Sequence, residues 1–414
     1  MKKILILGNS AKEYALAKKL SDTCEVYVAP GSDLMSSFAN VIDIRDNSVS
    51  EVLEYAMENG IDMTIPCSLS SLQTNITELF EKNGQNIFAP SQNAINILAD
   101  KASAKKLLYK LRISTPRFGI FEKQNMVVDY IKNLRHPFVI KTNEPSSAVV
   151  LSDLKFSKGV LDSIFMKNAH KVVIEDYVAG TPFVFYTITD GYKALPIGSS
   201  ILYKHSLDGD GGQLTSGMGA CVPNYKLSLE NEAMLMESVV YPTLDYLNAQ
   251  NCQYVGILGV NGIIEKDGQL QILGYQTFLQ DADADSILEM IDTDIYSLIE
   301  SCTLGSFSDE VEYIPQKNMS AVSLVLNCTN KDNSNNYVTG LDNIDEDVKI
   351  SFYGNIRKNK YLEPEVEYGP VAVLTAYGRS ISSASDKVYN EAESVIFNGK
   401  RYRKDICKTV VSAI

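Results

Sequence analysis

The sequence predicts a multidomain protein that combines the α/β and α+β classes. We expect a doubly wound, Rossmann-like parallel sheet at the N-terminus and an α+β domain at the C-terminus. At ~100–200 residues per domain, a length of 414 residues suggests two to four domains. The first hundred residues alternate short apolar runs with helical patterns, which is typical of a parallel sheet because parallel strands need crossover helices. Later segments are richer in strand-like runs, which indicates α+β organisation there.

The N-terminal domain is expected over residues 1–100, followed by a linker helix over 101–116. The expected strands are Ile4–Leu7, Glu25–Ala29 and Ile61–Ile65, and the expected helices are Glu13–Leu20, Val49–Met57, Leu72–Glu81 and Ala94–Leu111. The last helix carries a basic stripe of Lys101, Lys105, Lys106 and Lys110, and Pro116 marks a boundary after it.

Three further parts follow: a small lobe over 117–190, a central domain over 191–320 and a C-terminal domain over 321–414. The small lobe is expected to contain the strands Phe118–Phe121, Phe138–Lys141, Ala148–Leu151, Lys171–Tyr177 and Phe183–Thr189 and the helix Val127–Asn133. The later parts are expected to contain the polar, glycine-rich segment Asp208–Gly219, the strands Tyr254–Ile264 and Leu270–Thr277, and the helices Leu229–Leu247, Ser286–Cys302 and Ser382–Val395. Asp267-Gly268 between the two strands is a strong hairpin signal.

Composition excludes several classes of protein. There are 38 Lys and Arg against 51 Asp and Glu, a net charge of −13, which argues against non-specific binding to nucleic acid or to an anionic membrane. No stretch reaches the ~18 apolar residues of a membrane helix. Seven scattered cysteines without a CxxC pair argue against a disulfide framework and a zinc ribbon, and three histidines form no cluster. We therefore expect a cytoplasmic protein.

Short motifs spread along the chain resemble one enzyme family. They are Lys3–Gly8, Glu13–Leu16, Val28–Gly31, Phe88–Ser91, Val173–Tyr177, Asp208–Asp210, Gly217–Ala220, Pro242-Thr243, Leu374–Gly378 and Tyr402–Ile406. Their order and spacing resemble glycinamide ribonucleotide synthetase (phosphoribosylamine–glycine ligase), a family of the ATP-grasp superfamily. The resemblance implies an ATP-grasp fold, ATP and Mg²⁺ as cofactors, and small-molecule partners in a monomer or homodimer. It also implies that ATP phosphorylates glycine and that the amine of 5-phosphoribosylamine then displaces phosphate.

The resemblance places a nucleotide site on the linker helix and the small lobe. Glu175 to Val178 correspond to the adenine-contacting linker, although an ordinary buried strand edge would look the same. Lys141 corresponds to a lysine that reaches the phosphates, and Lys101 or Lys105 to a second basic contact. The acidic ribose contact corresponds to Thr181 or Pro182. The family's glycine-rich lid corresponds to residues 142–148, which are shorter and contain neither Gly nor Lys.

Metal ligands of the family correspond to Gly274 and Gln276, which alternate on one strand, and the Arg two positions further on corresponds to Phe278. The aspartates at positions 281, 283 and 285 offer substitute carboxylates, so Gln276, Asp281 and Asp283 are candidate metal ligands. The alternative is that these aspartates cap the helix expected from Ser286. We favour the cap, because helix starts commonly carry such residues.

The family's sugar-phosphate contacts correspond to two segments. In the first, Gly8 and Glu13 are retained, Lys12 replaces an Arg and Tyr14 a His; a Gly-Pro-Glu segment corresponds to Cys67-Ser68-Leu69 without its carboxylate. The second is better retained, with Lys204, Asp208, Asp210, Thr215, Gly217 and Gly219 as candidate contacts. It could also be a solvated glycine loop. It is not a calcium loop, because Gly219 stands where the twelfth-position Glu would be.

Two classes of function therefore remain open. The first is a divergent ligase of the family, with the same or altered substrates. The second is a catalytically degenerate homologue that acts as a binding or scaffold protein. No residue is assigned as catalytic.

Overall fold

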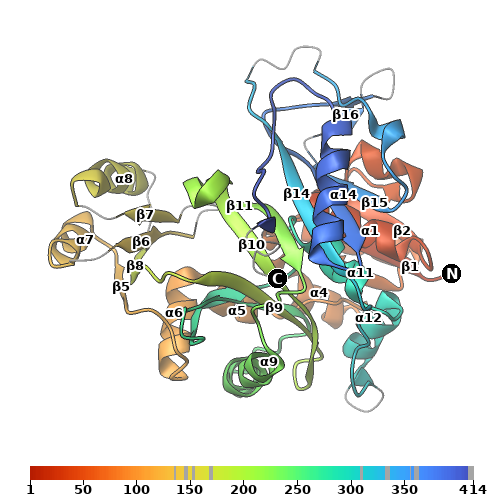
Figure 1. The fold of residues 1–414 in the computed structure, drawn as a ribbon. Coiled ribbons are helices and arrows are strands. Elements are labelled where there is room, and N and C mark those ends of the chain that lie inside the picture. The colour runs from red at the N-terminus through yellow and green to blue at the C-terminus, as the bar shows by residue number, and fades with distance from the viewer. Residues whose placement is uncertain are drawn as a thin grey trace.

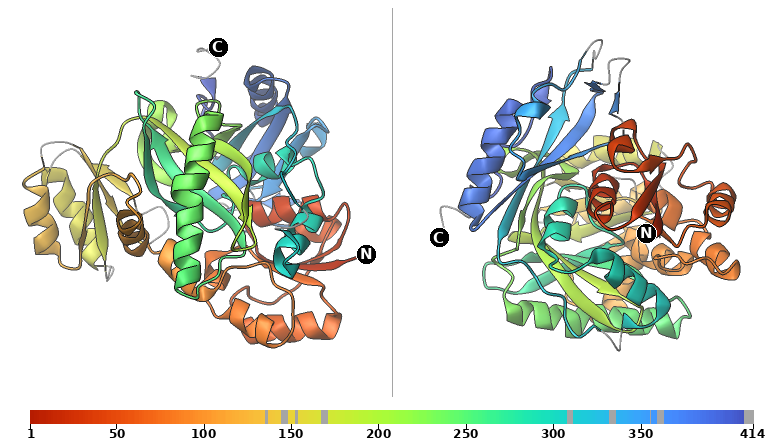
Figure 2. Two further views of the ribbon diagram at one scale, coloured as in Figure 1. Left: turned by 90° about the horizontal axis from the view of Figure 1, so that it is seen from below. Right: turned by 90° about the vertical axis from the view of Figure 1, so that its right-hand side faces the viewer.

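The computed structural model describes residues 1–134, 137–143, 148–151, 154–166, 171–307, 311–331, 336–354, 356–358 and 363–408; for 154–158 and 358 it describes the backbone alone. Figure 1 shows a small lobe that projects from a larger body, and Figure 2 shows the same arrangement from two further sides. No helix in these residues is both long and apolar enough to cross a bilayer.

The N-terminal sheet is parallel and has the strand order β3-β2-β1-β4. Its strands are β1 (Lys3–Gly8), β2 (Glu25–Pro30), β3 (Asn40–Val41) and β4 (Met63–Pro66), and its helices are α1 (Ala11–Leu20), α2 (Val49–Asn59), α3 (Leu69–Leu72) and α4 (Ile76–Lys82), with a 3-10 turn, η1 (Asp33–Ser37). The apolar residues of β1 are fully buried, which explains why its sequence is a continuous apolar run. The predicted doubly wound domain is confirmed.

The linker is two helices, α5 (Gln92–Leu98) and α6 (Lys101–Lys110), so the prediction of one helix over Ala94–Leu111 is wrong. Asp100 causes the break. Its side chain accepts a hydrogen bond from the Ser103 N–H (2.6 Å) and so caps a new helix.

The small lobe is an antiparallel sheet with the order β5-β8-β6-β7, covered by two helices. Its elements are β5 (Phe118–Phe121), α7 (Gln124–Ile131), β6 (Phe138–Lys141), β7 (Val149–Leu151), α8 (Leu154–Met166) and β8 (Val172–Asp176). Val127, Phe138, Leu161 and Ile174 belong to its separate core. The helix α8 was not expected from the sequence.

One nine-stranded antiparallel sheet runs through the rest of the chain, in the order β13-β12-β9-β10-β11-β14-β18-β15, with β19 paired to β14. The strands are β9 (Thr181–Thr189), β10 (Ala194–Leu207), β11 (Gly211–Val222), β12 (Gly256–Ile264), β13 (Leu270–Gln276), β14 (Ser320–Cys328), β15 (Val348–Phe352), β18 (Gly369–Gly378) and β19 (Lys400–Arg401). Because β11 pairs with β14, the sheet continues from the central part of the chain into the C-terminal part.

Helices flank this sheet. They are α9 (Leu229–Leu235), a π-helical turn (Met236–Val240), α10 (Tyr241–Ala249), α11 (Ala284–Met290), α12 (Ile295–Leu304) and α14 (Ile381–Ser394), and the short strands β16 (Arg357–Lys358) and β17 (Pro364–Glu365) pair nearby. The single helix expected over Ser286–Cys302 is wrong. Asp294 caps α12 by accepting a hydrogen bond from the Ser297 N–H (2.8 Å), so the helix breaks before it. The helix α11 packs on α1 and joins the sheet to the N-terminal domain.

Two of the seven cysteines are joined. Cys221 on β11 and Cys407 near the C-terminus form a disulfide with a Cα–Cα separation of 6.1 Å. The pair is separated by 186 residues, so local cysteine spacing gave no sign of it.

Candidate functional site

Four lysines gather where the linker helix, the small lobe and the large sheet meet. Lys101 and Lys105 lie on α6, Lys141 ends β6 and Lys204 lies on β10. Lys141 is close enough to the other three that its charge acts on the pKa of each. We call these four residues the lysine cluster.

Glu175 on β8 is the anionic partner of this cluster. Its side chain is 2% exposed and pairs with Lys105, whose Nζ lies 2.8 Å from Oε2, and with Lys141 at Oε1. Burial by itself would raise the pKa of the Glu175 carboxyl, but Lys141 and Lys105 hold it below its ordinary value. Lys105 also donates to Thr115 Oγ1 (2.7 Å), which in turn donates to the Ile272 carbonyl (2.7 Å). These contacts fix Lys105 in place.

The other two lysines, Lys101 and Lys204, have lowered pKa values. Burial, together with the charges of Lys141 and Lys204, lowers the pKa of Lys101 to about 8. Burial and Lys141 lower the pKa of Lys204 to about 8, against a smaller opposing effect of Asp283. Burial is the largest cause of both shifts, and repulsion from neighbouring lysines adds to it. A bound polyanion would relieve this repulsion.

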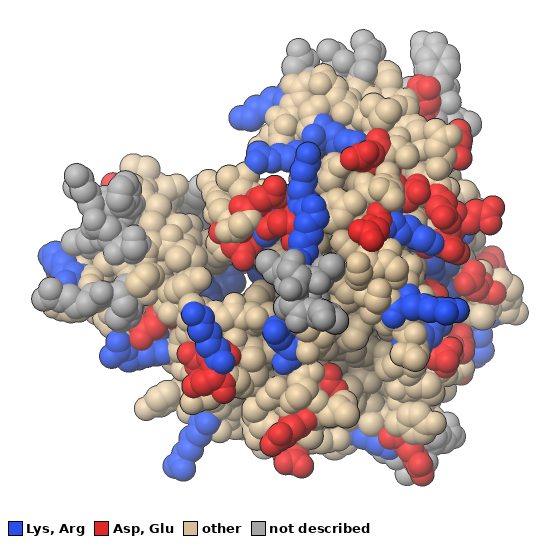
Figure 3. Space-filling model, viewed as in Figure 1, with Lys and Arg blue, Asp and Glu red and all other residues tan. Residues whose placement is uncertain are grey.

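The lysine cluster lies at the base of the small lobe. Figure 3 shows an indentation between that lobe and the main body, with basic side chains visible there. Lys101 bonds through Nζ to the Thr142 carbonyl and through its backbone N–H to Asn143 Oδ1 (2.9 Å), which ties α6 to the residues after β6. The middle of the expected lid, residues 144–147, lies outside the described residues.

The expected adenine linker leaves the small lobe beside this cluster. Glu175 is buried in β8, whereas Val178 is half-buried in the segment that leads to β9. Thr181 and Pro182 are the first two residues of β9 and pair with β12. The structure therefore brings Glu175 together with Lys101, Lys105 and Lys141 and leaves Val178 outside their ion pairs.

The glycine-rich segment is a long β-hairpin rather than a loop. Asp208–Asp210 form the 3-10 turn η2 between β10 and β11, and Gly217 and Gly219 lie within β11. A Cβ on Gly219 would lie 2.4 Å from the Ser323 carbonyl oxygen of β14, so close strand packing explains this glycine. Thr215 donates to the Lys204 carbonyl (2.9 Å) and accepts from the Gly217 N–H (3.2 Å) where the ladder is irregular.

The C-terminal residues 403–405 satisfy the charges of this turn. Arg403, whose side chain is 1% exposed, donates to Asp210 Oδ1 (2.9 Å) and forms two bonds to Asp405 (2.8 and 2.7 Å). The Lys404 N–H donates to Asp208 Oδ1 (2.8 Å), and the Gly209 N–H donates to Asp405 Oδ2 (2.8 Å). Both aspartates of the turn therefore have structural partners.

The loop after β1 is also internally bonded. The Ser10 N–H donates to Glu13 Oε2 (2.8 Å), and Lys12 Nζ lies 3.4 Å from Glu13 Oε1. Burial disfavours the charged form of Lys12, but Glu13 and Asp281 raise its pKa above the ordinary value. Gly8 has a φ of +136°, and a Cβ there would lie 2.5 Å from Glu13 Oε1, which explains the glycine.

The expected metal positions on β13 carry no carboxylate. Gly274 has no side chain, and a Cβ there would meet no atom within 4 Å. Gln276 Oε1 accepts a hydrogen bond from Gln280 Nε2 (2.8 Å). The residues that the structure describes contain no group of three His, Cys, Asp or Glu side chains that could hold a metal ion.

The nearby aspartates bond to protein groups. Asp283 is buried and accepts from the Tyr186 hydroxyl (3.0 Å) and the Ser200 hydroxyl (2.7 Å), and burial raises its pKa to about 6. It occupies the N-cap position of α11, but its side chain forms no cap hydrogen bond, so capping is not its role. Asp281 Oδ1 accepts from the Lys12 N–H (3.0 Å). This donor set does not fit a divalent ion held by the protein.

One residue of the cluster, Lys204, lies in a different site from the one expected. Lys204 was expected among the sugar contacts, but its pKa responds to Lys141, far away in the chain. No local pattern signals this, because the contact depends on how the small lobe sits beside β10. The resemblance would let Arg401 or Arg403, in or beside the matched motif Tyr402–Ile406, approach the ligand cleft, but Arg403 bonds to Asp210 and Asp405 instead.

Comparisons with known sequences match one family over nearly the whole chain. The family model of the phosphoribosylglycinamide synthetase N domain matches residues 2–97, and that of its ATP-grasp (A) domain matches residues 99–284. A phosphoribosylamine–glycine ligase of Neisseria meningitidis is 26% identical over 422 residues, which cover 99% of this chain and 100% of the relative. One of Clostridium acetobutylicum is 27% identical over 421 residues, with 98% and 100% covered.

Solved structures show the same fold. The phosphoribosylamine–glycine ligase of Thermotoga maritima matches with a TM-score of 0.80 at 22% identity, over 98% of this chain and 100% of that one. Biotin carboxylase of Campylobacter jejuni, solved as a β-γ-ATP complex, matches with a TM-score of 0.73 at 14% identity, over 97% and 92%. The chain therefore has the ATP-grasp fold, with the lysine cluster inside the matched ATP-grasp domain.

Proposed function

Because this chain belongs to the phosphoribosylglycinamide synthetase family, we propose that it is an ATP-dependent carboxylate–amine ligase of purine biosynthesis. We expect it to act in the cytoplasm as a monomer or homodimer. Its substrates would be ATP, glycine or a similar small amino acid, and a phosphorylated amine such as the 5-phosphoribosylamine after which its relatives are named.

The observation that carries this proposal is the lysine cluster. ATP brings several negative charges, and the lysine cluster holds four cationic side chains, of which Lys105 and Lys141 pair with Glu175. Charge-assisted hydrogen bonds from lysine to phosphate are strong, and the partial burial of the cluster strengthens them further.

The roles of the side chains follow from their contacts. Glu175 pairs with Lys105 and Lys141, so it holds these two lysines in place at the edge of the small lobe. Lys101 and Lys204 would neutralise charge on the phosphates, which stabilises the group as it is transferred to the carboxylate. The amine would then displace phosphate to give the amide.

A second candidate is a nucleotide-binding homologue without ligase activity. The observation that favours it is the donor set at β13, where Gly274 and Gln276 stand at the positions of the family's metal ligands and the nearby Asp283 is bonded to Tyr186 and Ser200. Without a carboxylate at these positions, the protein contributes no anion to a divalent ion there. For that reason we assign no step of the reaction to a protein-held metal.

One experiment separates the two candidates. The purified protein is incubated with Mg-ATP, glycine and freshly prepared phosphoribosylamine, while ADP and the amide product are measured and ATP binding is followed by calorimetry. Formation of glycinamide ribonucleotide with equimolar ADP supports the ligase. Nucleotide binding without any product supports the second candidate, and the absence of nucleotide binding contradicts both. Lys141→Met serves as the control in which nucleotide binding should be much weaker.

A further inference from the structure

One lysine of the cluster, Lys204, differs from the others in the surroundings of its amine. The other three amines each contact a protein oxygen, which is the Thr142 carbonyl for Lys101 and the Glu175 carboxylate for the remaining two. The Lys204 amine forms no hydrogen bond or ion pair in the part of the chain that the structure describes. Within the cluster, this amine is therefore the one most available to a ligand.

The carboxylate whose charge acts on Lys204 already has other partners. It belongs to Asp283, which accepts hydrogen bonds from the hydroxyls of Tyr186 (3.0 Å) and Ser200 (2.7 Å). Burial and the charge of Lys141 outweigh the effect of Asp283, so the pKa of Lys204 is lowered to about 8. At neutral pH a larger share of this amine is therefore uncharged than in an ordinary lysine, whose pKa is ~10.4.

The backbone holds Lys204 in place while its side chain stays partly exposed. The Lys204 carbonyl accepts a hydrogen bond from the Thr215 hydroxyl (2.9 Å), and Tyr203 and His205 on either side of it pair with β11. A desolvated lysine beside another cation is the arrangement that makes an amine nucleophilic. The neighbouring Lys141 would in addition bind an anionic group on the compound that reacts.

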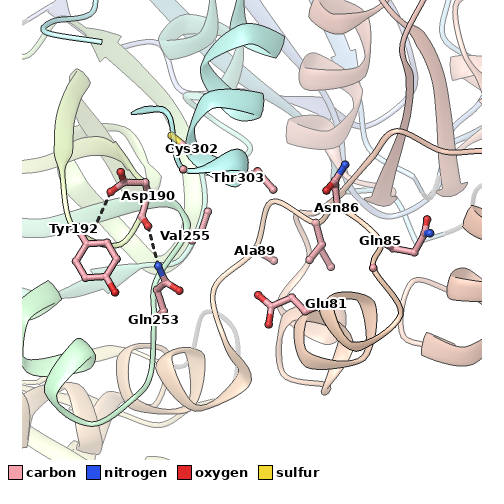
Figure 4. A pocket seen from close by; sticks show the side chains of 13 residues that line it. Glu81, Gln85, Asn86, Ala89, Asp190, Tyr192, Gln253, Val255, Cys302 and Thr303 are labelled. Atoms are coloured by element: carbon pink, nitrogen blue, oxygen red, sulfur yellow. Dashed lines mark hydrogen bonds between the residues drawn. The ribbon is translucent and has the colours of Figure 1, made fainter. Parts of the chain in front are cut away.

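A cavity elsewhere in the fold lacks such an arrangement. It has a volume of about 530 Å³ and is formed by the end of α4, the β9–β10 turn and the end of α12, and none of the described residues that line it is Lys or Arg. Figure 4 shows that Asp190 is bonded within its own turn, where it accepts the Tyr192 N–H (2.9 Å), and that Gln253 donates to its carbonyl (3.2 Å). A phosphorylated compound would find no cation there, so we expect it to bind at the lysine cluster.

We propose that Lys204 is a modification site for phosphorylated aldehydes, which it binds as an imine while Lys101 and Lys141 hold the phosphate. The lone pair of Nζ attacks the aldehyde carbon, and a proton of the amine moves to the former carbonyl oxygen to give a carbinolamine. Loss of water then leaves a C=N bond, so one amine and one aldehyde give one imine and one water without an oxidant or a metal. The bound aldehyde fills the site and excludes a nucleotide. The inference concerns the cluster of the proposed function but does not require ligase activity.

The test uses pyridoxal 5′-phosphate as the phosphorylated aldehyde, added to the full chain without nucleotide. The imine is reduced with borohydride, and the labelled residue is identified by peptide mass spectrometry. We expect one label per chain, on Lys204. Pyridoxal, which lacks the phosphate, should label this residue about tenfold more slowly, because it loses the charge-assisted contacts to the neighbouring lysines. Inorganic tripolyphosphate should protect Lys204, since it competes for the same cations.

Lys204→Arg keeps the positive charge but cannot form an imine, so the label should be lost, whereas Lys106→Arg, at an exposed position of α6, should label like the wild type. Melting curves check folding, and the mapping in the wild type decides the matter if Lys204→Arg does not fold. Labelling mainly on another lysine, equal labelling by pyridoxal, or no protection by tripolyphosphate would overturn the inference. ATP binding without any labelling would refute this inference alone. Labelling of Lys204 without nucleotide binding would support it and refute the proposed function.

Discussion

The lysine cluster and the Asp208–Asp210 turn both involve β10, and the sequence marked both as ligand contacts. Their charges are balanced differently. In the turn, the buried Arg403 pairs with Asp210 and Asp405, so each charge already has its partner. In the cluster, Glu175 pairs with two of the four lysines, Lys105 and Lys141, and the pKa values of Lys101 and Lys204 are lowered to about 8. The retained charges of the turn thus serve the fold, whereas those of the cluster are the basis of the proposed nucleotide site.

The largest effect on stability is expected in the turn. Arg403→Met should lower the free energy of unfolding by about 3 kcal/mol, because a buried cation with charged partners on both sides is lost. Urea denaturation measures this, and calorimetry should show ATP affinity changed by less than about twofold, within the scatter of such comparisons. Arg401→Met, on an exposed residue of the same segment, is the control. A large loss of ATP affinity in folded Arg403→Met would show that the turn binds ligand.

In the lysine cluster we expect the opposite: a large effect on ATP affinity and a small effect on stability. Lys141→Met should weaken ATP binding about 30-fold, equivalent to about 2 kcal/mol for a lost charge-assisted hydrogen bond. Because Lys105 still pairs with Glu175, the melting temperature should change little. Lys106→Met removes an exposed lysine from α6, the helix that carries Lys101 and Lys105, and should leave ATP affinity unchanged. Equal affinities for Lys141→Met and Lys106→Met would rule out the cluster as the phosphate site.

Raising the pH should act on the cluster in two opposite ways. Lys101 and Lys204 lose their protons near pH 8, so ATP affinity should fall about tenfold between pH 7 and pH 9. The nucleotide-free protein should instead gain stability from these groups between about pH 8 and pH 10.5, where the unfolded chain binds more protons than the folded one. Calorimetry and urea denaturation across this range measure the two effects. An ATP affinity that is flat from pH 7 to pH 9 in the wild type, and unaltered by Lys204→Gln, would contradict this account.

The smallest effect is expected from removing Mg²⁺. Because Gly274 and Gln276 provide no carboxylate, EDTA should change ATP affinity by less than about threefold, or ~0.6 kcal/mol. In Gln276→Glu, a carboxylate faces the same site and binding should become stronger when Mg²⁺ is present. Strong dependence on Mg²⁺ in the wild type would show that other residues hold the ion.

The N-terminal sheet and the ATP-grasp family could be predicted from the sequence because their signals are local. The strand β1 is a continuous apolar run, and Gly8 must be glycine to accommodate Glu13. The helix breaks at Asp100 and Asp294 were missed, because the apolar periodicity continues across both caps.

Contacts between distant segments could not be predicted. The glycine-rich segment forms a hairpin in which β11 pairs with β10, and β11 also pairs with the distant β14, where Gly219 lies opposite Leu324. Arg403 completes the turn from near the C-terminus, and Lys204 joins lysines of the linker and the small lobe. Register between remote strands and pairing between remote charges leave no periodic trace in the sequence.

The β11–β14 ladder has a consequence for shortened forms of the protein. A fragment that stops before Ser320 would still contain β11, but with one side of its backbone unpaired over Gly219–Val222. Such an open strand is a template for pairing with another molecule, so the fragment would be prone to aggregate even if its nucleotide site were intact. The strand β14 thus protects β11 from pairing with other molecules. A shortened protein that keeps β11 should therefore also keep β14.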